Sequence, residues 1–132
     1  ALRGLAVRPK HLAMGEWTIA EGRALFRKLM DSEPRPTAVV CGNAHLAVGA
    51  VLEAVAMGLQ LPEDLSIVGY DDIEIMSHLP IPVTTVRVPS AEIGRIAARV
   101  LVARVEGREH SAPLEAEAEL VIRASSGPPP MS

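Results

Sequence analysis

Short apolar runs alternate with helical patterns from residue 37 to residue 124, and this alternation constrains the fold more than any other feature. Four runs rich in Val, Ile, Leu and Thr have the length and composition of strands: residues 37–42, 65–70, 83–88 and 118–124. Strands separated by helices pair most readily in a parallel sheet, through right-handed crossovers. The sequence therefore predicts an α/β fold, a mostly parallel sheet flanked by helices.

The expected helices carry start and stop signals. A helix that begins near Ala44 is predicted to end at Gly58, because glycine readily takes the left-handed conformation found after a helix. Thr18 precedes Glu21 by three residues, a capping-box pattern that opens a helix upstream. Ser90 is expected to cap a further helix of about 15 residues. The apolar face of that helix comprises Ile93, Ile96, Ala97, Val100 and Leu101.

The 132 residues have room for one domain and one core. We expect residues 1–126 to fold, with a further strand at residues 4–7. The Ser-, Gly- and Pro-rich end "SSGPPPMS" is expected to fray, with residues 127–132 forming a disordered tail. The N-terminus has neither a Met nor a signal-peptide pattern, so we interpret the chain as part of a longer protein.

Charge and composition argue against several functions for this segment. The net charge is -3, with 13 basic and 16 acidic residues interspersed, which disfavours direct nucleic-acid binding. A single cysteine, Cys41, cannot form an internal disulfide and suits a reducing compartment. No apolar run approaches the roughly 20 residues that span a bilayer.

Polar or aromatic side chains stand at three expected strand-to-helix junctions. Asn43 directly follows one strand, Asp71 follows the next, and Trp17 lies in a loop before a helix. Ligands of open α/β sheets gather at the carboxyl ends of the strands. A carboxylate accepts hydrogen bonds from hydroxyl or ring N–H groups, an amide donates and accepts, and an indole can stack on a ring. These three residues are the candidate ligand-binding set.

Other roles are open to the same residues. Asp71 and Asp72 with His45 or His78 would offer metal ligands, but adjacent residues on an extended segment point in opposite directions. A receiver-like magnesium site would want a nearby lysine, and both lysines lie in the N-terminal quarter. No G-x-S-x-G elbow is present. We therefore expect no metal site, no cofactor and no catalytic residue.

Purely structural roles also compete with ligand binding. Asp72 is interpreted first as a cap for a short helix that begins near Ile73, while Asp71 could bond backbone N–H groups in a turn. Asn43 could cap the helix after it. Trp17 could be a half-buried packing residue.

The chain resembles the LacI/GalR family of bacterial transcription repressors. The resemblance is carried by "LPEDLSIVGYDD", by "PVTTVRVPS" and by the surrounding pattern from about residue 15 to residue 126. It implies the C-terminal, Rossmann-like subdomain of a periplasmic-binding-protein-like (type I) effector domain. It further implies a cytoplasmic, non-enzymatic repressor that responds to a small polar effector such as a sugar or nucleoside. Operator DNA would be bound only through an N-terminal domain absent from these residues. A periplasmic sugar-binding receptor of a transporter is the alternative.

The ligand cleft of that family falls on Trp17, Asn43 and Asp71. This chain departs from the family at Ala44, where an Asp is usual, and at Val88 and Ser90, where relatives often have larger or more polar contacts. The departures predict an unusual effector or weak binding.

The expected helix 44–57 is apolar almost all round, since its only clearly polar side chains are His45 and Glu53. Such a helix is buried on more than one side, either by neighbouring helices or by a second copy of the chain. The resemblance favours a homodimer formed through this helix and the short helix after "YDD". The interface candidates are Val48, Leu52, His78 and Leu79.

Overall fold

The computed structural model describes residues 9–108 and 115–129. In chain order the elements are η1 (Pro9–His11), α1 (Ile19–Met30), β1 (Ala38–Val40), α2 (Ala44–Ala56), β2 (Ser66–Tyr70), α3 (Ile75–His78), β3 (Thr84–Arg87), α4 (Ser90–Val105) and β4 (Glu119–Val121). The strand expected at residues 4–7 lies outside the described residues.

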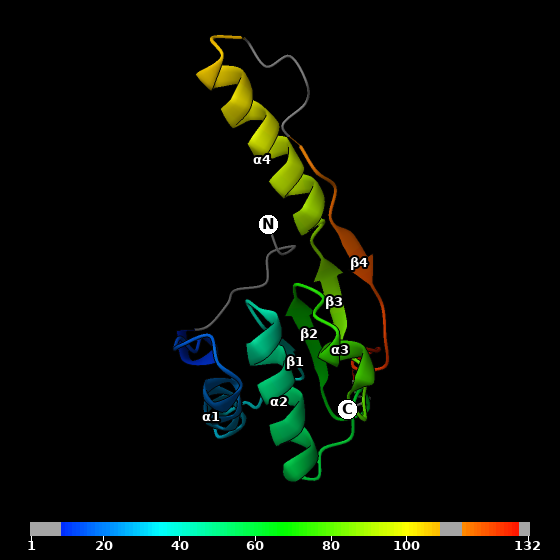
Figure 1. Cartoon of the computed structure of the whole chain (residues 1–132). Helices are drawn as coiled ribbons and strands as arrows, with labels where there is room; N and C mark the ends of the chain where they lie inside the picture. The colour runs from blue at the N-terminus through cyan, green and yellow to red at the C-terminus, as the bar shows by residue number, and fades with distance from the viewer. Residues whose placement is uncertain (1–8, 109–114, 130–132) are drawn as a thin grey trace.

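The described strands form one sheet in the order β1-β2-β3-β4. β1, β2 and β3 are parallel, with Val39 opposite Ile67 and Gly69 opposite Thr85, whereas β4 is antiparallel to β3. α1 and α2 pack together beside the sheet, and α4 extends beyond the end of β3, away from the other helices (Figure 1). The predicted α/β class with a mostly parallel sheet is confirmed.

The core lies between the sheet and the α1–α2 pair. Its fully buried side chains include Phe26 and Met30 from α1, Val51 from α2 and Ile67 from β2. Glycines let α1 and α2 approach backbone to backbone: a Cβ on Gly49 would lie only 2.3 Å from the carbonyl oxygen of Ile19. The close crossing brings the first turns of both helices to the same edge of the sheet.

The predicted helix ends are confirmed in part. The Thr18 hydroxyl accepts a hydrogen bond from the Glu21 N–H at 3.1 Å, and Gly58 follows α2 with φ of 75°. The expected Ser90 cap is wrong. Pro89 occupies the cap position of α4, and the Ser90 hydroxyl instead lies 3.4 Å from the Val88 carbonyl oxygen, to which it donates. Pro89 already has φ of -77°, so the helix begins without a side-chain cap.

The expectation that "SSGPPPMS" frays is wrong at its first residue. Ser125 is fully buried, its hydroxyl donates to the Ile67 carbonyl at 2.6 Å, and the same hydroxyl accepts from the Thr84 N–H at 2.9 Å. Gly127 N–H also donates to the Ser66 hydroxyl at 3.1 Å. These bonds join segments about 40 to 60 residues apart, which local composition cannot reveal. Residues 130–132 lie outside the described part of the chain.

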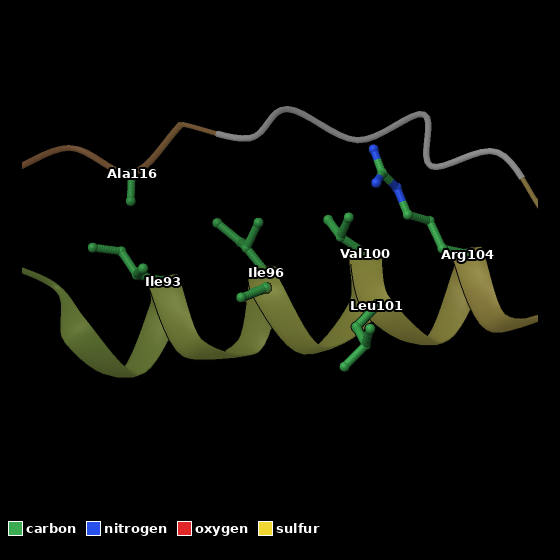
Figure 2. A pocket seen from close by; sticks show the side chains of 7 residues that line it. Ile93, Ile96, Val100, Leu101, Arg104 and Ala116 are labelled. Carbon is green, nitrogen blue, oxygen red and sulfur yellow. The ribbon is translucent and has the colours of Figure 1, made fainter.

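α4 differs from the other long helices because Ala103 is its only buried residue. Its predicted apolar face lines an open hollow of about 540 Å³ together with Arg104 and Ala116. Figure 2 shows Ile93 and Ile96 on the side of the helix that faces Ala116. Within the described residues, no helix combines the length and apolarity needed to cross a bilayer.

Candidate functional site

The three candidate ligand-binding residues meet at the carboxyl end of the parallel strands. Trp17, Asn43 and Asp71 line one open pocket of about 240 Å³. The remaining lining residues are Gly42, Tyr70, Val88 and Ser90. Each parallel strand delivers part of the wall, because β1 leads into Asn43, β2 into Asp71 and β3 into Val88. Because β1, β2 and β3 are parallel, their carboxyl ends lie at the same edge of the sheet.

Asn43 caps α2 and also faces the pocket. Its Oδ1 atom accepts a hydrogen bond from the Leu46 N–H at 2.8 Å, and its backbone is extended, as expected for a cap residue. The cap uses the carbonyl oxygen of the amide, so the Nδ2 group keeps its donor capacity. The structural role is therefore shown, and it orients the side chain for a second contact.

The Asp71 loop is anchored through its main chain. The Asp71 N–H donates to the Val86 carbonyl at 2.9 Å, and the Asp71 carbonyl accepts from the Thr85 hydroxyl at 3.1 Å. Asp71 has φ of 72°, an unusual left-handed conformation for a residue with a side chain. Among the described residues no hydrogen bond reaches its exposed carboxylate, so the proposed turn role of that side chain has no support.

Two exposed aromatic rings border the pocket. Trp17 is 73% exposed, so the interpretation of this tryptophan as a half-buried packing residue is wrong. Tyr70 is 48% exposed and lines the same pocket, a contribution that sequence reasoning missed. The available signal was strand alternation: Ile67 and Gly69 of β2 are buried, so Tyr70 at the strand end points to the accessible side.

Asp72 does not cap α3, contrary to the first interpretation. Glu74 holds the cap position without a side-chain bond, whereas the Asp72 side chain is only 7% exposed and pairs with Arg87 and Arg123. The hydrogen bond from Arg123, and after it that from Arg87, holds the pKa of Asp72 below its usual value despite burial. Within the described part of the chain, the Asp71 carboxylate thus has no hydrogen-bond partner, whereas the ionised Asp72 carboxylate is paired with two guanidinium groups.

Metal ligands do not converge in residues 9–108 and 115–129. No group of three or more His, Cys, Asp and Glu side chains comes together there. Cys41 is buried, and that burial raises the pKa of its thiol to about 12, which keeps it in the unreactive thiol form.

Two of the four interface candidates are not surface residues. Val48 is 2% exposed and Leu79 is 9% exposed, and both belong to the core, whereas Leu52 and His78 are exposed. α2 is apolar on several sides mainly because the sheet covers one face and α1 covers another. Even Glu53 is buried, at 1% exposure, beneath hydrogen bonds from Arg23 and Arg27.

Those two guanidinium groups lower the pKa of Glu53, so its carboxylate is charged at the α1–α2 contact. Charge-assisted hydrogen bonds therefore join α1 to α2. The Nε groups of Arg23 and Arg27 on α1 donate to the Glu53 carboxylate on α2, at 2.8 Å and 2.9 Å.

Helices beside a mostly parallel sheet, with polar and aromatic side chains around an open pocket at the strand ends, are typical of α/β domains that bind small molecules. The sequence profile of the family described as "Periplasmic binding protein-like domain" matches residues 2–126. The chain belongs to this family.

Known relatives narrow the class to LacI-family regulators. The HTH-type transcriptional repressor CytR of Escherichia coli K12 is 37% identical over 124 residues, which are 93% of this chain and 36% of CytR. A LacI-family regulatory protein from Chloroflexus aggregans is 40% identical with a TM-score of 0.81, covering 93% of this chain and 45% of that structure. The transcriptional regulator CelR in its cellobiose complex is 32% identical with a TM-score of 0.85, covering 93% and 38%.

The resemblance to the LacI/GalR family is therefore confirmed, and the homologues are transcriptional repressors rather than enzymes. The chain spans less than half the length of these relatives.

Proposed function

We propose that this chain is the effector-sensing and dimerisation part of a LacI-type transcriptional repressor, and that it binds a small polar ligand of the sugar or nucleoside class. The observation that carries the proposal is the convergence of Trp17, Asn43 and Asp71 on one pocket at the strand ends. The homologous regulator CelR forms a complex with cellobiose, which supports a hydroxylated ligand. The homology to repressors favours this function over that of a transport receptor.

The pocket offers complementary groups for such a ligand. The exposed Asp71 carboxylate accepts hydrogen bonds from vicinal hydroxyls or ring N–H groups, and the Asn43 amide donates one. Trp17 and Tyr70 present ring faces for a sugar or base, while Val88 adds an apolar contact. None of these residues needs a cofactor or a catalytic step to bind the ligand.

A second lobe would complete the site. The pocket measures about 240 Å³, below the roughly 300 to 1,000 Å³ of typical small-molecule sites, and it is open to solvent. α4 leaves its apolar face exposed above the pocket edge. In the proposed arrangement the remaining part of the repressor packs on α4 and closes the cleft over the ligand.

The ligand would act by shifting a population of conformations. A ligand that contacts both lobes favours the cleft geometry in which those contacts form together, and it can shift the equilibrium only by its difference in affinity for the two geometries. In the proposed mechanism, this shift changes the affinity for operator DNA of a DNA-binding domain outside these 132 residues.

The dimer is proposed to use the exposed side of α2 and α3. Leu52 and Val55 lie three residues apart on α2 and are 36% and 44% exposed, and Ile75 on α3 is 48% exposed. His78 is exposed on α3, one turn from Ile75. These residues replace the core residues Val48 and Leu79 as the candidate contacts.

The test of ligand binding uses the intact protein that contains this chain, titrated calorimetrically with D-ribose, cellobiose and adenosine. We expect at least one probe to bind and Asp71→Asn to weaken that binding by about tenfold or more, because a charge-assisted hydrogen bond is lost. Asp31→Asn, at the exposed end of α1, is the matched control and should bind like the wild type. Equal affinities for Asp71→Asn and wild type would remove Asp71 from the site.

A further inference from the structure

Four charged side chains form a continuous cluster beside the pocket. The Arg87 guanidinium donates to Asp72 at 2.8 and 3.0 Å and to Glu119 at 2.9 Å. Arg123 donates to the two Asp72 carboxylate oxygens at 2.7 and 2.9 Å. The cluster therefore runs Glu119–Arg87–Asp72–Arg123, and it joins the loop after β2 to β3 and to the β4 segment.

The cluster sits where the chain leaves the sheet for α4 and returns from it. Arg87 ends β3 and directly precedes Val88, a pocket residue, and Glu119 begins β4. α4 makes few contacts with the other elements, and Ala103 is its only buried residue. The direction of α4 must therefore be set mainly at these two connections (Figure 1).

Asp72 is the common partner at that point. Its side chain is 7% exposed, against side-chain exposures of 15% for Arg123, 49% for Arg87 and 66% for Glu119. A buried carboxylate that holds two guanidinium groups in fixed geometry constrains them more strongly than an exposed pair does. Its neighbour Asp71 lines the pocket with an exposed carboxylate, so a movement of Asp72 would displace a pocket residue directly bonded to it in the chain.

We propose that Asp72 is a positioning residue: through Arg87 and Arg123 it fixes the β3–α4 and β4 connections relative to the Asp71 loop. Val88 and Ser90 are thereby held opposite Trp17 and Asn43, and α4 is held in one direction relative to the sheet. That Asp72 matters for ligand binding rests on the proposed function of the pocket. Its effect on the direction of α4 can be tested without any ligand.

The test measures distances between spin labels by double electron–electron resonance. Labels are placed on cysteines introduced at Ala24 of α1 and Ala98 of α4, both exposed, while the buried Cys41 stays unlabelled. In the 132-residue chain we expect a single narrow distribution. Asp72→Asn should broaden it by about twofold or more, because two guanidinium groups lose their charged partner. Glu119→Gln, which removes only the exposed outer pair, should leave the wild-type distribution.

The readout separates positioning from mere stabilisation. A variant that is only less stable melts at a lower temperature yet keeps the wild-type distances well below its melting point. Unchanged distances in folded Asp72→Asn would overturn the inference, whatever ligand the pocket binds. If Asp72→Asn does not fold, Arg87→Gln takes its place, since it keeps the Asp72–Arg123 pair; broadening is again expected, and a wild-type distribution would again overturn the inference.

Discussion

The guanidinium group of Arg123 donates hydrogen bonds to both carboxylate oxygens of Asp72, at 2.7 and 2.9 Å, although the two residues are 51 positions apart in sequence. Asp72 directly follows Asp71, whose exposed carboxylate lines the candidate ligand pocket. The two acids of the "YDD" motif thus differ in their contacts. Asp71 lines the pocket, whereas Asp72 links the loop after β2 to Arg87 of β3 and to Arg123 after β4.

The pH dependence of stability should report on this pair. Hydrogen bonds from Arg123 and Arg87 lower the folded-state pKa of Asp72, so its contribution is complete above the unfolded pKa of about 4 and is lost as pH falls through the lower folded value. Thermal melts at several pH values should show a gap between wild type and Asp72→Asn that is largest at neutral pH and narrows in acid. Glu53 has a lowered pKa too, so acid also destabilises the variant. A gap that is the same at every pH would contradict the assignment.

The α1–α2 crossing should not tolerate a methyl group. Gly49→Ala would place Cβ 2.3 Å from the Ile19 carbonyl oxygen and 2.8 Å from the Arg23 nitrogen, both backbone atoms. We expect a loss of about 1–3 kcal/mol in the free energy of unfolding, measured by urea denaturation. Gly94→Ala on α4 is the matched control, because, apart from the neighbouring residues and backbone of its own helix, no atom of residues 9–108 and 115–129 lies within 4 Å of the added Cβ. Alanine is favoured over glycine in a helix by about 1 kcal/mol, so this control should be neutral or stabilising.

Ser125 should matter despite its place near the end of the chain. Ser125→Ala leaves the buried Ile67 carbonyl and Thr84 N–H without their hydroxyl partner, which we expect to lower the free energy of unfolding by about 1–3 kcal/mol. Ser77→Ala is the comparison, since its exposed hydroxyl donates to the local Glu74 carbonyl, and the loss in free energy of unfolding should stay within about 0.5 kcal/mol. Equal stabilities of the two variants in urea would show that the Ser125 network is dispensable.

The oligomeric state should depend on the exposed side of α2. Leu52→Arg is expected to convert a dimer at micromolar concentration into a monomer in sedimentation velocity, because a charge would be buried against its own copy. Ala24→Arg, on the exposed part of α1, should sediment like the wild type. The interface proposal fails if the wild type is already monomeric, or if Leu52→Arg remains dimeric.

Prediction from the sequence worked best where neighbours along the chain decide the structure. Thr18 and Gly58 were recognisable because caps depend on a few consecutive residues. The predicted cap at Ser90 is wrong by one position, because Pro89 occupies the cap position and the helix begins without a side-chain cap. Val48 is an interface candidate by sequence but a core residue in the structure, because helical periodicity shows that α2 is apolar on several sides but not which side α1 covers.

By itself, the sequence determined the succession of strands and helices along the chain. Strands separated by helices pair in parallel, and parallel strands end at the same edge of the sheet, so the sequence also placed Trp17, Asn43 and Asp71 at a common edge. Only the tertiary structure decided that Asp72 turns to Arg87 and Arg123, that Ser125 is buried, and that Glu53 lies beneath α1. Those contacts join residues far apart in the chain. Their geometry follows from how the packed elements meet, which no short stretch of sequence contains.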